Sequence, residues 1–231
     1  MARINKSAVT KLEIVRESSR QFLEKGYTAT SISGISKALE MSPGNLTFHY
    51  PTKEHLLAEL VNILCDFRWK LMETEADEGI SSILAICLEL TSMVSASEDD
   101  PIIKDFFLSA YSSPLCLEII RRNDTERAKK VFGSFRPDWT HEQYAESEIL
   151  CSGIEYATLM TAGDPVPQET RITGALNSIL SIFGIPDEIR QQKLRKVFAM
   201  DHKGLGKRVL KEFREYVEQA NEQAFKDLLK L

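Results

Sequence analysis

Apolar residues recur at spacings of three and four along most of the chain, with polar residues between them. The first such stripe consists of Ala8, Leu12, Val15, Ser19 and Phe22. This period is that of an amphipathic α-helix. The sequence shows no sustained apolar/polar alternation and contains no Asn-Gly or Asp-Gly hairpin signal. The pattern therefore predicts an all-α protein.

Turn and capping residues divide the first 75 residues into three short helices and one long helix. The residues that mark the divisions are Gly26 as a C-cap, Thr30 or Ser31 as an N-cap, Ser42 and Pro43 at a helix start, Pro51 as a stop, and Thr52 as an N-cap. The long fourth helix is predicted to run to about residue 75. The three short helices fit a compact helical unit, and the fourth leads away from it.

Downstream, the pattern predicts helices near 80–96, 102–111, 114–132, 140–163, 168–184, 187–199 and 204–230. The breaks between them coincide with Pro and Gly clusters. We expect two parts, a head over residues 7–67 and a helical body over residues 68–231. The boundary falls inside the fourth helix, which makes the connection rigid.

Composition is typical of a soluble globular protein, and the charge is unevenly spread. The chain has 231 residues, 29 Lys or Arg and 34 Asp or Glu, and a formal net charge of −5. Residues 1–55 carry eight basic and five acidic side chains, whereas residues 56–231 carry 21 and 29. A basic head on an acidic body is expected where only the head meets a polyanion.

Targeting and redox signals are missing from the sequence. We find no apolar run long enough for a membrane span and no signal-peptide core. The four Cys lie far apart without a CxxC pair, which argues against a zinc ribbon or a disulfide scaffold. The prediction is a cytoplasmic protein with reduced, buried thiols.

The candidate catalytic motifs in the sequence are each incomplete. His141-Glu142 begins like a zincin motif, but Ala145 stands where the second His is needed. Gly206-Lys207 lacks the earlier Gly of a P-loop, and Arg208 replaces the required Ser or Thr. The acidic clusters are expected at helix ends and in loops as solvated faces. We therefore predict no enzyme, no metal and no cofactor.

Residues 31–50 are predicted to form a helix-turn-helix. One short helix (31–39) braces a second (43–50) across a tight turn at residues 40–42. In such a unit the N-terminal end of the second helix enters the major groove. Ser42, Asn45 and Thr47 can hydrogen-bond to bases or phosphates. His49, Tyr50 and Lys53 are predicted to form a phosphate clamp beside the groove.

At this point the sequence resembles the tetracycline-repressor (TetR) family of bacterial transcription regulators. The matching residues, in register across 32 positions, are Gly26, Tyr27, Thr30, Ser31, Ile35, Ala38, Ser42, Gly44, His49, Tyr50, Lys53, Glu54, Leu56 and Leu57. The DNA-binding residues indicated by the motif and the resemblance are Thr30, Ser31, Ser42, Pro43, Gly44, Asn45, Thr47, His49, Tyr50 and Lys53.

Two departures from the family pattern bear on the operator sequence. Glu40 stands where the family has a turn Gly, so the turn is expected to be strained or reshaped. Thr47 replaces a Tyr, and we expect Phe48 and Tyr50 to compensate for its lost reach. Structural alternatives remain open, because Ser42 is also a helix cap and His49 also fits a packed core position.

The resemblance implies a dimer interface of two helices from each subunit. The residues predicted there are Gly153, Ala157, Met160, Ile172, Ala175, Leu176, Ile179 and Phe183. The alternative is that these stripes face only their own core, which periodicity cannot decide. The final helix is expected to pack across the body or the partner subunit.

The resemblance also implies a ligand cavity in the body, between the fourth helix and those after it. The residues predicted to line it are Cys65, Trp69, Phe106, Phe107, Tyr111, Cys116, Tyr144, Glu148, Cys151, Glu155, Tyr156 and Met160. Glu148 and Glu155 are acids seven apart on one face of an otherwise apolar helix. If buried, they suit a cationic or hydrogen-bonding ligand.

Together these features predict a homodimeric transcription regulator that binds a palindromic site in double-stranded DNA. Its most direct form is a repressor released by a small-molecule effector, with no membrane partner. The fourth helix is expected to be the only element that touches both head and cavity, with Trp69 as the point on which a ligand presses. The alternatives are a helical small-molecule-binding protein and a protein-partner adaptor that does not bind DNA.

Overall fold

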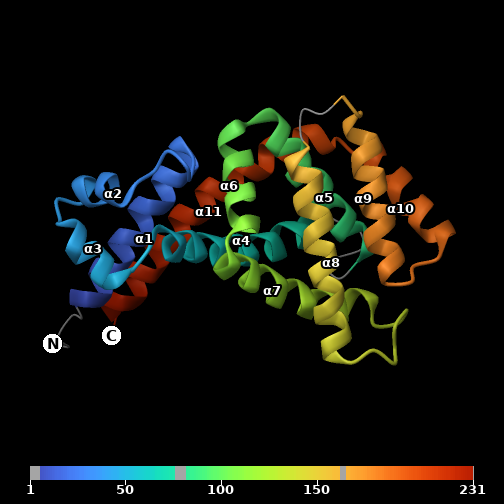
Figure 1. Ribbon diagram of the computed structural model, residues 1–231, viewed down its shortest axis with the longest axis horizontal. Coiled ribbons are helices and arrows are strands. Elements are labelled where there is room, and N and C mark those ends of the chain that lie inside the picture. Colours follow the sequence, from blue (N-terminus) through green and yellow to red (C-terminus); the bar gives the residue numbers. More distant parts are fainter. Residues whose placement is uncertain (1–5, 76–81, 162–164, 231) are drawn as a thin grey trace.

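The computed structural model describes residues 6–75, 82–161 and 165–230, and within these ranges it contains helices and no strand (Figure 1). The helices are α1 (Lys6–Lys25), α2 (Ile32–Ala38), α3 (Pro43–His49), α4 (Lys53–Glu75), α5 (Ile83–Asp99), α6 (Pro101–Ser112), α7 (Pro114–Phe132), α8 (His141–Met160), α9 (Gln168–Ile182), α10 (Asp187–Ala199) and α11 (His202–Lys230). The all-α prediction is confirmed. None of the described helices is both long and apolar enough to cross a membrane.

The head consists of α1, α2, α3 and the first turns of α4. Ser31 caps α2 by accepting a hydrogen bond from the Gly34 amide at 3.0 Å, as the sequence predicts. Ser42 caps α3 in the same way through the amide of Asn45 at 3.2 Å, with Pro43 in the first turn. A small apolar core joins these helices, made of Ile14, Phe22, Ile35, Leu46, Leu56 and Leu57.

Two backbone positions in the head have a positive φ. Gly26 ends α1 with φ of 90°, where a residue without Cβ is favoured. Glu40, in the turn between α2 and α3, has φ of 52°, a value that non-glycine residues uncommonly adopt. Glu40 thus occupies a left-handed conformation that glycine adopts at lower cost, so the strain predicted at this position is present.

The body is built around α5, which is buried along nearly its whole length. Helices α6, α8, α9, α10 and α11 all pack against α5. Ser82 caps α5, so the helix predicted from residue 80 begins at residue 83, and residues 80–81 lie outside the described ranges. Likewise α8 ends at Met160, and residues 162–163 of its predicted end are outside those ranges.

Helix α11 connects the body to the head. Its N-terminal part packs on α5 and its C-terminal part on α1, so the C-terminal part of α11 lies beside the head (Figure 1). Phe213 of α11 packs on Phe67 of α4 and on Phe106 of α6, with ring centroids 5.3 and 6.2 Å apart. The last helix therefore packs across its own subunit.

Helix α4 is not the only element that joins the head to the body. Helices α6 and α11 also contact α1. Arg214 of α11 donates a hydrogen bond to the Leu23 carbonyl at 3.0 Å, and Arg16 of α1 pairs with Glu218 of α11 at 3.1 Å. The periodicity of a helix shows which of its faces is apolar, but it does not show which neighbour covers that face. In the part of the chain that the structure describes, α4, α6 and α11 each join the head to the body.

Five of the eight residues predicted at a dimer interface lie in the core of this chain. Ile172, Ala175, Leu176, Ile179 and Phe183 are all buried between α9 and the rest of the body. Their position agrees with the alternative given above, in which the apolar stripe of α9 faces the core of its own chain. The other three, Gly153, Ala157 and Met160, are exposed on the outer face of α8.

Candidate nucleic-acid interface and body pocket

Helix α3 presents its N-terminal residues to solvent. Ser42, Pro43, Gly44 and Asn45 are exposed, and no side chain restricts the space beside Gly44, where a Cβ would have only Ser42 Oγ within 4.0 Å. Ser31, the cap of the bracing helix α2, is exposed as well. A helix start with small, polar residues can approach base edges or phosphates closely.

Phe48 is the residue of this surface that sequence reasoning underrated. Its side chain is 81% exposed, the largest value among the exposed large apolar residues. It lies one turn after Asn45 on the same face of α3, and its ring meets that of His49 edge to face at 5.3 Å. An exposed aromatic side chain suits apolar contact with a thymine methyl group. The signal was the spacing of three from Asn45.

Two of the predicted DNA-binding side chains, Thr30 and Tyr50, are buried in the head, and a third, Thr47, bonds back to its own helix. Thr30 is buried and donates its hydroxyl to the Gly26 carbonyl at 2.8 Å. The half-buried Thr47 donates to carbonyls in the first turn of its own helix. Tyr50 is 9% exposed, and burial raises the pKa of its phenol. These residues shape the surface, whereas His49 remains half-exposed beside it.

Lys53 holds the loop between α1 and α2. Its ammonium group donates to the carbonyls of Tyr27 and Thr30 at 2.8 and 2.9 Å and lies 4.0 Å from the centre of the Tyr27 ring. Partial burial lowers the pKa of Lys53, which the nearby Asp105 carboxylate opposes. An ammonium group has three donors, so one remains for a phosphate. This anchoring role was not visible in the sequence.

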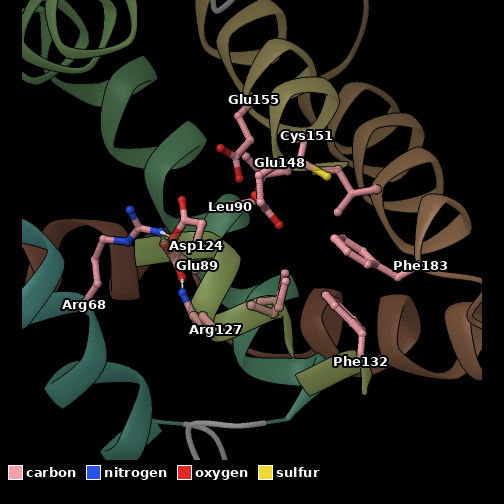
Figure 2. Close-up of a pocket in the computed structure, with 13 residues that line it drawn as sticks. Arg68, Glu89, Leu90, Asp124, Arg127, Phe132, Glu148, Cys151, Glu155 and Phe183 are labelled. Carbon is pink, nitrogen blue, oxygen red and sulfur yellow. Dashed lines mark hydrogen bonds and ion pairs between the residues drawn. The ribbon is translucent and has the colours of Figure 1, made fainter. Parts of the chain in front are cut away.

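The body contains a small pocket between α4, α5, α7, α8 and α9 (Figure 2). Its volume is about 400 Å³ when the part open to solvent is included. The centre of a water molecule can reach only about 30 Å³ of this volume. Of the predicted cavity residues, Glu148, Cys151 and Glu155 line it. Sequence reasoning missed Arg68, Ile86, Glu89, Leu90, Asp124, Arg127, Ala128 and Phe132 as lining residues, and expected Ile179 and Phe183 at the dimer interface.

One side of the pocket is a buried ion-pair network. Glu89 of α5 forms ion pairs with Arg68 of α4 and Arg127 of α7, and Arg68 also pairs with Asp124 at 3.0 Å. Despite its burial, the two guanidinium groups lower the pKa of Glu89, whereas burial raises that of Asp124. The network joins α4, α5 and α7. The sequence carried a signal for it, since Arg68 continues the apolar stripe of α4.

Two further carboxyl groups lie beside this network on α8. Glu155 accepts a hydrogen bond from the Tyr111 hydroxyl at 2.7 Å, and burial with the nearby Asp124 raises its pKa to about 8. Glu148 is 7% exposed, and burial together with Asp124 and Glu155 raises its pKa well above the ordinary value. The sequence-based expectation that these acids share one face is met.

The remaining predicted cavity residues lie elsewhere. Cys65, Phe106, Phe107, Cys116 and Tyr144 are buried in the surrounding core and do not line the pocket. Tyr111 does not line the pocket, but its hydroxyl donates a hydrogen bond to Glu155, which does. Tyr156 is half-buried, Met160 is exposed on the outer face of α8, and the side chain of Trp69 lies outside what the structure describes. In the described ranges no group of three or more His, Cys, Asp or Glu side chains is arranged to hold a metal.

Comparison with known proteins gives a match to the head. Residues 14–60 match the family model for bacterial regulatory proteins of the tetR family. The HTH-type transcriptional regulator QacR of Staphylococcus aureus (strain Mu50 / ATCC 700699) is 48% identical over 42 residues, or 18% of this chain. This chain spans about a fifth (22%) of the length of that curated relative.

Among solved structures, the fold resembles that of RolR in its ligand-free crystal form. The TM-score is 0.58 at 15% identity, over 79% of this chain and 95% of RolR. At this identity the likeness concerns the fold alone. It extends the agreement from the head into the helical body.

Proposed function

Since the chain belongs to the tetR family of bacterial regulatory proteins, we propose that it is a sequence-specific transcription regulator that binds operator DNA through α3. The observation that carries the proposal is the exposed N-terminal face of α3, from Ser42 to Asn45, braced by α2. Asn45 addresses base edges, and Phe48 contacts thymine methyl groups. We further propose a head at residues 7–67, a body at residues 68–231, and action in the cytoplasm.

The proposed regulator acts as a homodimer through α8 and α9. Gly153 and Ala157 are exposed on α8, together with Ile149, Leu150 and Met160, each more than half exposed. Gly174 and Ser178 are exposed on α9, and a Cβ on Gly153 or Gly174 would meet nothing within 4 Å. Small residues let helices approach closely, and the apolar side chains around them lose water on association. Two subunits present two recognition helices about 34–36 Å apart for successive major grooves.

We propose that the regulator is a repressor and that an effector in the body pocket releases it. Arg68 places α4 at the pocket, and Lys53 places the same helix at the α1–α2 loop. An effector that prefers a dimer with a different head spacing lowers DNA affinity by linkage. A hundredfold loss requires about 2.7 kcal/mol of differential binding.

The test is selection of binding sites from random duplex DNA by the full chain, followed by mobility shift. We expect an enriched palindrome whose half-sites lie about one helical turn apart. Asn45→Ala and Phe48→Ala should change the selected sequence while leaving the fold, measured by circular dichroism, unchanged. An exposed residue of the body, Glu118→Gln, is the matched control.

Failure to enrich any sequence, with the protein folded and dimeric, would overturn the DNA-binding proposal. It would favour the protein-partner adaptor instead. Enrichment of a single, non-palindromic half-site would retain DNA binding and overturn the symmetric dimer.

A further inference from the structure

We propose that the body pocket takes a small organic cation, with the Glu148 carboxylate as its counter-ion. This deepens the proposed effector site and rests on it. The argument comes from the charge balance of the pocket, from the position of Glu148 in it, and from the aromatic rings opposite (Figure 2).

The described ionisable groups that line the pocket do not balance. The two guanidinium groups of Arg68 and Arg127 face the four carboxyl groups of Glu89, Asp124, Glu148 and Glu155, which gives a formal charge of −2 if all are ionised. The guanidinium groups are engaged by Glu89 and Asp124. The two acids of α8 therefore have no ion-pair partner of their own among the described residues, although the nearby Arg68 opposes the rise in the pKa of both.

Glu148 is the strongest indication of a cation site in this pocket. Its side chain is 93% buried, with 7% exposed, and it lines the pocket between the ion-pair network and the aromatic side (Figure 2). Among the residues that the structure describes, it has neither a hydrogen-bond partner nor an ion-pair partner. A buried carboxyl group without a partner is costly, and a bound cation with N–H donors removes that cost.

The opposite side of the pocket is aromatic. Phe132 of α7 and Phe183 at the end of α9 stack with ring centroids 4.2 Å apart, and both line the pocket. Aromatic faces attract cations, and the attraction strengthens in a desolvated site. The pocket therefore has a carboxylate on one side and aromatic rings on the other. This arrangement favours a flat or compact organic cation. An inorganic ion is less suited, because it would lose more of its hydration on entering the pocket.

Protonation of the two glutamates lowers the cost of their burial. Around Glu148 and Glu155 lie Arg68 from α4, Glu89 from α5, Tyr111 from α6, Asp124 and Arg127 from α7, and Cys151 on α8 itself. Burial and the neighbouring acids raise the pKa of both glutamates, Glu155 to about 8. A cation that stabilises the ionised form therefore displaces a proton when it binds.

The size of the pocket limits the ligand. With space for roughly one water, the pocket admits a larger cation only when lining side chains move. Movement of Phe132 or Phe183 changes the packing of α7 and α9, and displacement of Arg68 acts directly on α4. Occupation of the pocket is thereby coupled to the helix that carries Lys53.

Isothermal titration calorimetry of the full chain tests the proposal with two cations and their neutral isosteres. The probes are benzamidinium against benzamide and guanidinium against urea. We expect at least one cation to bind tenfold or more tightly than its isostere. Glu148→Gln should abolish that preference, whereas Glu146→Gln, an exposed acid two residues away on α8, should keep it. Equal affinity for both cations and their isosteres, or an unchanged preference in Glu148→Gln, overturns the proposal.

The pH dependence provides a second measurement. Affinity for benzamidinium, which stays charged, should rise with pH, by up to tenfold per pH unit for each proton released, as long as the glutamates of the free pocket are protonated. It should level off above their raised pKa values, about 8 for Glu155 and well above the ordinary value for Glu148. Proton release, seen as a dependence of the heat on buffer ionisation, should accompany binding and disappear in the Glu148→Gln, Glu155→Gln double variant. A flat profile in the wild type with no proton release overturns the counter-ion role.

Mobility shift separates this inference from the proposed function. Operator binding without any cation preference retains the regulator and overturns the cation site. Cation binding that leaves operator affinity unchanged retains the site and overturns its role as the switch. A tenfold or greater loss of operator affinity with benzamidinium, absent in Glu148→Gln, supports both.

Discussion

Asp105 of α6 accepts two hydrogen bonds from Thr28, one from its amide at 2.8 Å and one from its hydroxyl. Thr28 lies in the loop between α1 and α2, so this carboxylate ties the entry of the helix-turn-helix to the body. The carboxylate oxygen that accepts from the Thr28 amide would lie only 2.8 Å from a Cβ on Gly26. The tie therefore depends on a glycine at the end of α1.

Asp105→Ala should loosen the head without unfolding the body. Loss of two hydrogen bonds to a charged acceptor, half-buried, is expected to cost about 1–2 kcal/mol. For a chain of this size, that lowers Tm by roughly 2–8 °C. Differential scanning calorimetry measures the shift, with Glu118→Gln on the exposed face of α7 as control. A Tm within error of the wild type would show that the bonds to Thr28 do not hold the loop.

Lys53→Ala should affect both DNA binding and the head itself. Its ammonium group holds the Tyr27 and Thr30 carbonyls, so its loss should lower the unfolding free energy by about 1–2 kcal/mol. If its third donor meets a phosphate, the slope of log affinity against log salt should also fall by about one. Urea unfolding and mobility shift at several salt concentrations separate the two effects. A lower stability with an unchanged salt slope would assign Lys53 to the loop alone.

Local signals explain why the head was predictable from sequence. Ser31 and Ser42 cap helices within three residues of themselves, and Gly26 marks a C-cap, so each can be recognised from neighbouring residues. The resemblance then supplied the helix-turn-helix register. The position of Lys53 escaped because its partners are carbonyls 23 and 26 residues away, which no side-chain pattern reveals.

The body was less predictable because its contacts are long-range. The apolar stripe of α9 identified Ile172 and Ile179 as covered, but not whether their own core or a second subunit covers them. The pocket was only partly found, because Glu148 and Glu155 stood out on α8 whereas Arg127 is separated in sequence from its partner Glu89 by 38 residues. Charges that meet across three helices cannot be paired from one-dimensional spacing.

The two positive-φ residues of the head should differ in their response to substitution. Gly26→Ala places a Cβ against Asp105 at φ of 90°, and we expect a loss of about 1–2 kcal/mol. Glu40→Gly relieves strain at φ of 52°, but the added freedom of the unfolded chain offsets it, so the net change should stay within about 1 kcal/mol. Chemical unfolding compares them. An equal loss for both would contradict the assigned conformations.

The dimer proposal predicts different outcomes for exposed and buried residues of α8 and α9. Gly153→Glu and Ala157→Glu introduce charges on the exposed face, so both should give folded monomers with at least a hundredfold weaker operator binding. Ile179→Glu places a charge in the core and should unfold the body instead. Sedimentation velocity and circular dichroism decide. Intact dimers for both α8 variants would move the interface to another surface.

Arg214 offers a test of how the pocket reaches the head. It lies on α11, donates to the Leu23 carbonyl near the end of α1, and approaches Asp100 at 3.7 Å. The ion pair is exposed and adds little stability, so Arg214→Ala should lower Tm only by the loss of the single hydrogen bond to Leu23, about 1 kcal/mol or roughly 2–4 °C. The hydrogen bond to α1, however, fixes the head against α11.

If head tilting is resisted by α11, removal of that bond should make the head easier to turn. The effect of a pocket ligand on operator affinity should then increase by about threefold to tenfold. Arg208→Ala, at an exposed position earlier on α11, serves as the control. Mobility shift with and without benzamidinium measures the ratio. A ratio identical to that of the wild type would mean that α4 and α6 alone set the angle of the head and that α11 is only a structural cover for the body.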